Sequence, residues 1–190
     1  PINMSSTSIP PTAQSYQNYL YYNELMKNDN IRIIKLTPER WREYKSLRLL
    51  ALRDEPQAFY STYSKEAAYS DEKWQEKAAR LIVFAQAEKQ LIGMIGAWKP
   101  KKDKEGTLNI YGVYVIPRYR GRGVSKIMMR ELLEELNSNR SINKLKLEVN
   151  KNQSAAIRLY ESFGFKITGQ ENAQMGDGNY YDEYLMEKDL

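Results

Sequence analysis

The sequence predicts an α/β (α+β) fold, in which one mixed, mostly antiparallel sheet carries helices on both faces. Short apolar runs of strand length alternate along the chain with longer segments whose apolar residues recur at helical spacing. Two of the apolar runs, residues 81–87 and 91–98, are separated by only three polar residues, which indicates an antiparallel hairpin. At 190 residues and 42% hydrophobic content, the chain is long enough to bury a core without disulfide bonds.

The elements before this hairpin are one strand and two helices. Residues 31–36 are the expected strand. Thr37 is expected to cap the first helix, because a proline and a glutamate follow it, and this helix should end near Arg53. Residues 58–64 are expected to form a loop, and a second helix should run from a cap at Ser70 to about residue 80.

Strands and helices alternate in the second half of the chain. In chain order, the expected elements are a strand at 108–115, a helix at 124–137, a strand at 145–149, a helix capped by Asn152 and ended by Gly164, and strands at 165–169 and 180–186. Residues 176–179, Gly-Asp-Gly-Asn, predict a tight turn between the last two strands.

Residues 1–29 differ in composition from the rest of the chain. They are rich in Ser, Thr, Gln, Asn, Pro and Tyr, with few aliphatic residues. We interpret them as an N-terminal extension, either flexible or exchanged as an arm between two copies of the chain in a homodimer. Residues 30–190 are expected to form a single domain.

The absence of cysteine and histidine excludes several kinds of site. It rules out disulfides, thiolate or histidine metal sites, a cysteine nucleophile and a Ser-His-Asp triad. We therefore expect no metal, and any acid-base chemistry must use Glu, Asp, Tyr, Lys, a terminus or water.

The net charge of +5 is modest and suits an anionic cofactor. Nucleic-acid binding is the competing interpretation, but it is disfavoured because the basic residues cluster locally and form no long stripe. We expect no membrane interaction, since no apolar run approaches the ~18 residues that a membrane span needs. With no signal for secretion near its start, the chain is expected to be cytoplasmic.

A basic, glycine-rich loop lies between the strand at 108–115 and the helix at 124–137. Its residues 118–123 read Arg-Tyr-Arg-Gly-Arg-Gly. Backbone N–H groups and a helix N-terminus at such a junction favour phosphate oxygens, and the arginines supply opposite charge. A solvated basic turn is the alternative interpretation. A dinucleotide fingerprint would need a third glycine, and a Walker A loop would need Gly-Lys-Ser/Thr.

A second motif follows in residues 147–165, which begin Leu-Glu-Val-Asn-Lys-Asn and end Leu-Tyr-Glu-Ser-Phe-Gly-Phe. The two segments, in this order with one helix between them, resemble the two signatures of the GNAT superfamily of acetyl-CoA-dependent N-acetyltransferases. The resemblance covers about residues 108–168 by motif and 31–190 by overall layout.

The resemblance implies an enzyme that moves the acetyl group of acetyl-CoA to a primary amine of a small molecule or peptide. It places the pyrophosphate of coenzyme A on the loop and the pantetheine arm along the preceding strand. The implied cofactor-binding residues are Val113, Val115, Arg118, Arg120, Gly121, Arg122, Gly123, Val124, Ser125 and Asn152.

Two residues are candidates for catalysis. Tyr160 matches the family's tyrosine that protonates the leaving sulfur, although a buried helix aromatic would look the same. Glu148 is the candidate base, because related peptide N-terminal acetyltransferases place a base in a similar run and alternation puts it opposite Leu147. A structural salt bridge and a water relay are the alternatives for Glu148. Asn109, at the position of the glutamate that other members use, cannot serve.

The acceptor amine, the acyl-chain preference and the oligomeric state are left open by the sequence. Tyr60, Tyr63, Tyr69 and Trp74 would suit an aromatic-walled acceptor pocket, but core packing explains them equally well. A non-catalytic module that binds coenzyme A as a sensor is the alternative function.

Overall fold

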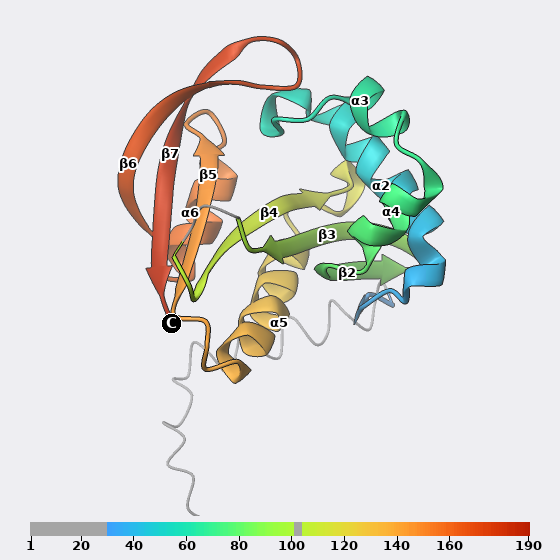
Figure 1. Cartoon of the computed structure of the whole chain (residues 1–190), viewed down its shortest axis with the longest axis horizontal. Helices are drawn as coiled ribbons and strands as arrows, with labels where there is room; N and C mark the ends of the chain where they lie inside the picture. Colours follow the sequence, from blue (N-terminus) through green and yellow to red (C-terminus); the bar gives the residue numbers. More distant parts are fainter. Residues whose placement is uncertain (1–29, 101–103) are drawn as a thin grey trace, which may run out of the picture.

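The computed structural model describes residues 30–100 and 104–190 (Figure 1). The expected N-terminal extension and part of the basic segment around residues 99–104 lie outside these residues. Within the described residues, seven strands form one sheet in the order β1-β2-β3-β4-β5-β7-β6. All described neighbours are antiparallel except β4 and β5, which confirms the predicted mixed, mostly antiparallel sheet.

The strand bounds agree with most of the sequence expectations. In sheet order they are β1 (Arg32–Ile34), β2 (Leu81–Ala87), β3 (Gln90–Trp98), β4 (Thr107–Val115), β5 (Lys144–Asn150), β7 (Tyr180–Asp189) and β6 (Lys166–Gln174). The β6–β7 hairpin is longer than predicted, because its polar, exposed residues give little alternation to recognise.

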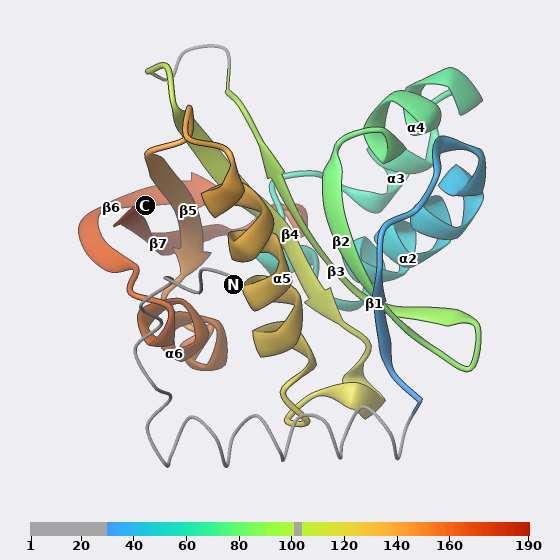
Figure 2. The same ribbon diagram turned by 90° about the horizontal axis from the view of Figure 1, so that it is seen from below.

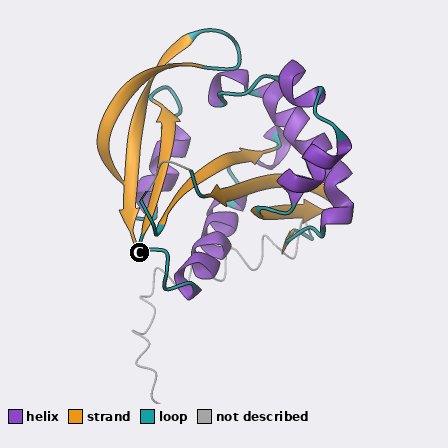
Figure 3. Cartoon of the chain, viewed as in Figure 1, coloured by secondary structure: helices purple, strands orange, loops and turns teal. Residues whose placement is uncertain are grey.

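Helices cover both faces of the sheet, as predicted (Figure 2). On one face lie α2 (Trp41–Asp54), α3 (Tyr63–Ala67) and α4 (Asp71–Ala78), and on the other α5 (Val124–Ser138) and α6 (Ser154–Ser162). Within the described residues, short 3-10 turns complete the connections: η1 (Pro38–Arg40), η2 (Pro56–Ala58) and η3 (Pro117–Tyr119). Figure 3 shows the helices and the strands of the sheet in separate colours.

Two local predictions for the segment before β2 are wrong. Residues 58–64 were expected to form a loop, but α3 begins at Tyr63, where the side chain of Thr62 accepts a hydrogen bond from Lys65 N at 3.1 Å. The Thr37 side chain makes no cap bond, because the chain first completes the 3-10 turn η1 and α2 starts only at Trp41. The predicted cap at Ser70 is confirmed by its bond from Lys73 N at 3.3 Å.

Two buried clusters follow from the alternation of side chains across the sheet. Val83 packs under α5, whereas its neighbour Phe84 faces α2 and α4. On that second face Tyr44 meets Trp74 and Phe84 edge-on, with ring centroids 5.7 and 5.8 Å apart. Trp74 is fully buried, so core packing accounts for it.

A buried ion cluster joins α2, α3 and α4. Glu66 accepts hydrogen bonds from Arg48 Nη2 at 2.8 Å and from Lys77 Nζ at 3.0 Å. Burial alone would raise the pKa of Glu66, but the hydrogen bonds and charges of the two cations outweigh it and lower the pKa below its usual value. Glu66 is therefore ionised at neutral pH, and the cluster carries one net positive charge.

Among the helices that the structure describes, none combines the length and the apolar character that crossing a membrane would require.

Candidate functional site

The sheet opens between its two parallel strands. Strand β4 pairs with β5 at three positions: Thr107 with Lys144, Leu108 with Leu145, and Asn109 with Lys146. Beyond Asn109 and Lys146 the two strands form no further pairs. Both strands go on, β4 to Val115 and β5, still paired with β7, to Asn150. Figure 1 shows the two strands diverging from this point. The carboxyl half of β4 therefore has an edge to which an extended ligand could add hydrogen bonds.

A cleft of about 370 Å³ lies at this opening. Its walls come from β4, β5, η2 and the start of α6, elements far apart in the sequence. The sequence-predicted site residues that line it are Val113, Val115, Arg120, Glu148, Asn152 and Tyr160. The structure thus brings the two sequence motifs together in one site.

A β-bulge shapes the wall that β4 contributes. Gly96 of β3 pairs with Tyr111, and Met94 of β3 pairs with Tyr114. Two residues of β4, Gly112 and Val113, therefore lie opposite a single residue of β3. Gly112 has φ of 68°, a left-handed conformation that favours glycine. The sequence reasoning missed this bulge, although a glycine inside an otherwise strand-like run is a signal for one.

The basic loop has the predicted place between β4 and α5. Gly121 and Gly123 have φ of 73° and 79°, and α5 begins at Val124 without a side-chain cap. Its first intrahelical bond joins Ile127 N to Gly123 O at 3.1 Å, so the three preceding N–H groups point out of the helix. Such a terminus favours an anion.

The arginines of the loop differ in what they contact. Arg120 donates from Nε to the Val115 carbonyl at 2.9 Å and from Nη1 to Glu55 at 2.6 Å, which braces the loop against β4 and η2. Arg118 donates to Gln90 at 3.2 Å. The guanidinium groups of Arg118 and Arg122 lie 4.9 and 5.6 Å from the ring centroid of Tyr119.

The turn between β5 and α6 depends on a residue that the sequence reasoning did not select. Asn150 is 2% exposed, and its side-chain oxygen accepts a hydrogen bond from Asn152 N at 2.9 Å. Its amide reaches Gln57 O at 3.4 Å, across the cleft wall. The prediction that Asn152 caps the helix is wrong, because this Asx-type turn delays the start of α6 to Ser154 and puts Gln153 at the cap.

Tyr160 projects from α6 toward the cleft. It is 6% exposed and meets Phe165 edge-on, with the ring centroids 6.0 Å apart. Burial raises the pKa of its hydroxyl, so the phenol keeps its proton at neutral pH. A protonated phenol at the cleft is able to donate to a departing anion.

Glu148 lines the cleft from the opposite face of the sheet. Leu147 is in the core beneath α5 and α6, and alternation turns Glu148 toward the face that carries α2, as predicted. Glu183 and Glu171 lie on the same face, where the Tyr60 hydroxyl donates to Glu183 and lies 3.3 Å from a carboxylate oxygen of Glu171. Burial, together with the charges of Glu148 and Glu171, raises the pKa of Glu183.

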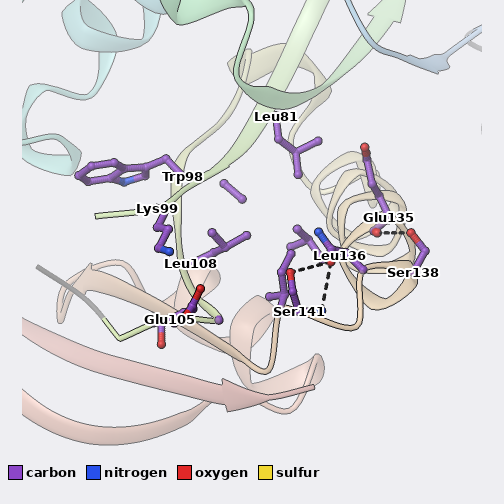
Figure 4. Close-up of a pocket in the computed structure, with 14 residues that line it drawn as sticks. Leu81, Trp98, Lys99, Glu105, Leu108, Glu135, Leu136, Ser138 and Ser141 are labelled. Atoms are coloured by element: carbon purple, nitrogen blue, oxygen red, sulfur yellow. Dashed lines mark hydrogen bonds between the residues drawn. The ribbon is translucent and has the colours of Figure 1, made fainter. Parts of the chain in front are cut away.

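A second hollow, of about 580 Å³, is shown in Figure 4. It lies at the other end of β4, between Leu108, Trp98 and the last turn of α5 at Leu136. It contains none of the predicted site residues. Among the residues with described positions, no cluster of Asp or Glu has the arrangement needed to hold a metal ion.

Comparisons with known proteins agree on one family. A model of the acetyltransferase (GNAT) family matches residues 46–165, well over half of the chain. The L-amino acid N-acetyltransferase AaaT of Escherichia coli is 26% identical over 153 residues, which cover 76% of this chain and 91% of that protein.

Two other relatives match less of their own length. The mycothiol acetyltransferase of Salinispora tropica is 30% identical over 135 residues, 69% of this chain and 43% of that protein. The spermine/spermidine N(1)-acetyltransferase of Bacillus subtilis is 31% identical over 68 residues, 36% of this chain and 45% of that protein. The chain spans less than half of each of these two proteins.

Solved structures share the fold. An acetyltransferase of the GNAT family from Streptococcus pneumoniae superposes with a TM-score of 0.72 at 19% identity, over 84% of this chain and 99% of that one. A putative acetyltransferase from Salmonella typhimurium, solved with its cofactor acetyl-CoA, gives a TM-score of 0.70 at 16% identity, over 84% and 94% of the two chains.

The β6–β7 turn holds one wall of the cleft in place. Gly176 N donates to Phe59 O at 2.7 Å, and a Cβ on Gly176 would lie 2.6 Å from Ser61 O. Because backbone atoms cannot give way as a side chain does, we expect Gly176→Ala to lower the free energy of unfolding by about 1–3 kcal/mol. Chemical denaturation measures this change.

The matched control is Gly169→Ala on the same hairpin. There a Cβ would lie 3.3 Å from the flexible Leu185 side chain, so the change should be within about 1 kcal/mol. Equal stability of the two variants would show that the turn does not depend on its contact with residues 59–61.

Proposed function

The chain belongs to the GNAT family of acetyltransferases, and we propose that it transfers the acetyl group of acetyl-CoA directly to the primary amine of an acceptor. Family membership makes it an acyltransferase, which leaves the non-catalytic sensor interpretation without support. The observation that carries the finer proposal is the cleft at the β4–β5 opening, which places a carboxylate and a phenol on either side of one gap.

Acetyl-CoA would lie along β4, with its pyrophosphate at the start of α5. The unpaired edge of residues 110–115 offers backbone donors and acceptors to the amide groups of the pantetheine arm. The N–H groups before Ile127 and the two glycines in left-handed conformation suit the pyrophosphate. The acetyl-CoA complex of the structurally similar Salmonella protein supports this co-substrate.

Transfer requires one bond to form and one to break. The neutral amine nitrogen attacks the thioester carbon, the C–N bond forms, and the C–S bond breaks as the tetrahedral intermediate collapses. Glu148, directly or through water, takes the proton that the amine loses, and Tyr160 gives its proton to the leaving sulfur. The opposite faces from which these residues come favour this division, because the amine enters at the carbonyl carbon from one side while the thiolate leaves from another.

The acceptor class is a separate matter. The relatives are named for L-amino acids, for mycothiol and for spermine or spermidine, acceptors of very different size and charge. L-amino acids and polyamines both carry amines, so these two names support an amine acceptor for this chain.

Gly121→Asp should weaken acetyl-CoA binding by at least ~10-fold, because it adds a negative charge and a side chain where the pyrophosphate is proposed to lie. Isothermal titration calorimetry measures the affinity. Gly178→Asp is the matched control, since both glycines have φ near 80° and no neighbour within 4 Å of an added Cβ. Equal affinities for the two variants would place the pyrophosphate elsewhere.

Tyr160→Phe keeps the ring against Phe165 and removes only the hydroxyl. We expect kcat to fall ~10²-fold, as for loss of a positioned acid, while KM for both substrates changes little. Steady-state release of the coenzyme A thiol reports both constants, and Tyr181→Phe, which loses a hydroxyl bonded to Asp177, is the control. Full activity of Tyr160→Phe would show that Tyr160 serves only in packing and is not the acid.

Glu148→Gln should lower kcat/KM ~10²-fold, and most at low pH, where removing a proton from the amine is hardest. The pH profile of kcat/KM with one good acceptor is the measurement. Glu171→Gln removes a carboxylate from the same face that does not line the cleft, and it should leave the profile intact. An unchanged rate and profile in Glu148→Gln would exclude this residue as the base.

A further inference from the structure

Two buried polar side chains lie directly opposite each other on β5 and β7. Asn150 pairs with Glu183, and the two residues are 2% and 4% exposed. Directly opposed residues of antiparallel strands put their side chains on one face of a sheet. This is the face of Glu148, which lies two residues before Asn150 on β5. Neither side chain bonds to the buried ion cluster of α2, α3 and α4, so their burial needs another explanation.

Both side chains hold the same short segment. Asn150 Nδ2 donates to Gln57 O at 3.4 Å, and the Tyr60 hydroxyl donates to the carboxylate of Glu183. These contacts fix the two ends of residues 57–60, and the two residues between them line the cleft. The opposed pair therefore determines where this wall of the cleft lies relative to the sheet.

The carboxylate of Glu183 is kept in this position at a cost. Burial raises its pKa, and the charges of Glu148 and Glu171 raise it as well, while the hydrogen bond from Tyr60 acts in the opposite direction. A raised pKa means that ionising Glu183 costs more in the folded protein than in the unfolded chain. An apolar residue would avoid this cost but could not bind the Tyr60 hydroxyl. The contact with the segment is thus the feature that a carboxylate supplies here.

Asn150 also bonds to the other wall of the cleft. Its Oδ1 accepts a hydrogen bond from Asn152 N at 2.9 Å, in the turn before α6. Helix α6 carries Tyr160, which lines the cleft. A single buried amide therefore connects the segment 57–60 to the start of the helix that holds the proposed acid, and it sets the separation between these two parts of the cleft.

We propose that Asn150 and Glu183 are positioning residues for the acceptor. By holding residues 57–60 against the sheet, they fix the wall on which the acceptor packs while its amine lies beside Glu148. The proposal rests on the proposed acetyl transfer to an amine and adds two residues to it, neither of which touches the reacting atoms. A displacement of a reactant by about 1 Å is enough to lower a rate ~10²-fold.

Two variants each remove one of these contacts without adding charge. In Asn150→Ser, the hydroxyl is still able to accept from the backbone N–H two residues later, but it is too short to reach Gln57 O. Tyr60→Phe keeps the ring and loses the hydrogen bond to Glu183.

Each variant has a matched control outside the cleft. Asn139 Oδ1 accepts from Ser141 N at 3.1 Å in a similar but exposed turn, so Asn139→Ser makes the same change without a wall contact. Tyr181→Phe removes a hydroxyl that donates to Asp177, another bond between a phenol and a carboxylate. Both controls should behave as the wild type.

The measurements are steady-state release of the coenzyme A thiol and calorimetry of acetyl-CoA binding. Leucine, phenylalanine and spermidine serve as acceptors, since relatives are named for these classes. Asn150→Ser and Tyr60→Phe should lower kcat/KM for the acceptor ~10- to 100-fold and change the affinity for acetyl-CoA less than ~2-fold. Calorimetry also counts the binding sites. A merely structural role would lower that count and leave the turnover per site unchanged.

Rescue by a conservative change tests Glu183 separately. Glu183→Gln keeps an oxygen that accepts from the Tyr60 hydroxyl, whereas Glu183→Leu has none. We expect Glu183→Gln to retain most of the turnover per site that Glu183→Leu loses. Equal losses in the two variants would show that the hydrogen bond to Tyr60 does not position the wall.

The remaining outcomes also decide the proposal. Wild-type turnover per site in Asn150→Ser and Tyr60→Phe, or equal losses in their controls, would overturn it while leaving acetyl transfer intact. A wild type that acetylates none of the three acceptors would count against the proposed function. Hydrogen exchange of residues 55–62 then tests the positioning alone. Faster exchange in both variants, but not in their controls, supports it, and unchanged exchange refutes it.

Discussion

The three-residue pairing of β4 with β5 is the constraint on which the site depends. Had the two strands paired along their full length, the backbone groups of residues 110–115 would be used within the sheet and no cleft could form between them. The strands separate because β5 stays paired with β7 through Asn150, while the bulge at Gly112 and Val113 bends β4. One stretch of unpaired edge thus provides both the cavity and its hydrogen-bonding wall.

A sheet opened in this way can be used from both faces. Side chains of successive residues on β5 point in opposite directions, so Glu148 faces the cleft on the side of α2 while Leu147 stays in the core under α5 and α6. Tyr160 reaches the same cleft from α6. The proposed acid and the proposed base therefore need not share one surface. On one surface, a carboxylate and a phenol in contact would perturb each other's pKa, as Tyr60 and Glu183 do.

The sequence predicted those features that are encoded locally. The β2–β3 hairpin, the glycine-rich loop before α5 and the orientation of Glu148 follow from short patterns, and the structure has all three. The contacts that the sequence reasoning missed join residues distant in the chain. Asn150 holds Gln57, Tyr60 donates to Glu183, and Arg48 pairs with Glu66 across a helix boundary. No periodicity or spacing within a window of the sequence reports such contacts.

The same distinction explains why the acceptor is harder to infer than the co-substrate. Residues 55–62, which form one wall of the cleft, are held by the buried Phe59 and by polar contacts from three directions: Arg120 to Glu55, Asn150 to Gln57, and Gly176 to Phe59. The exposed side chains of such a segment can change without rebuilding the core. The loop that precedes α5, in contrast, must keep its glycines to adopt left-handed backbone conformations. The fold therefore constrains the proposed co-substrate site strictly and leaves the acceptor wall open to variation.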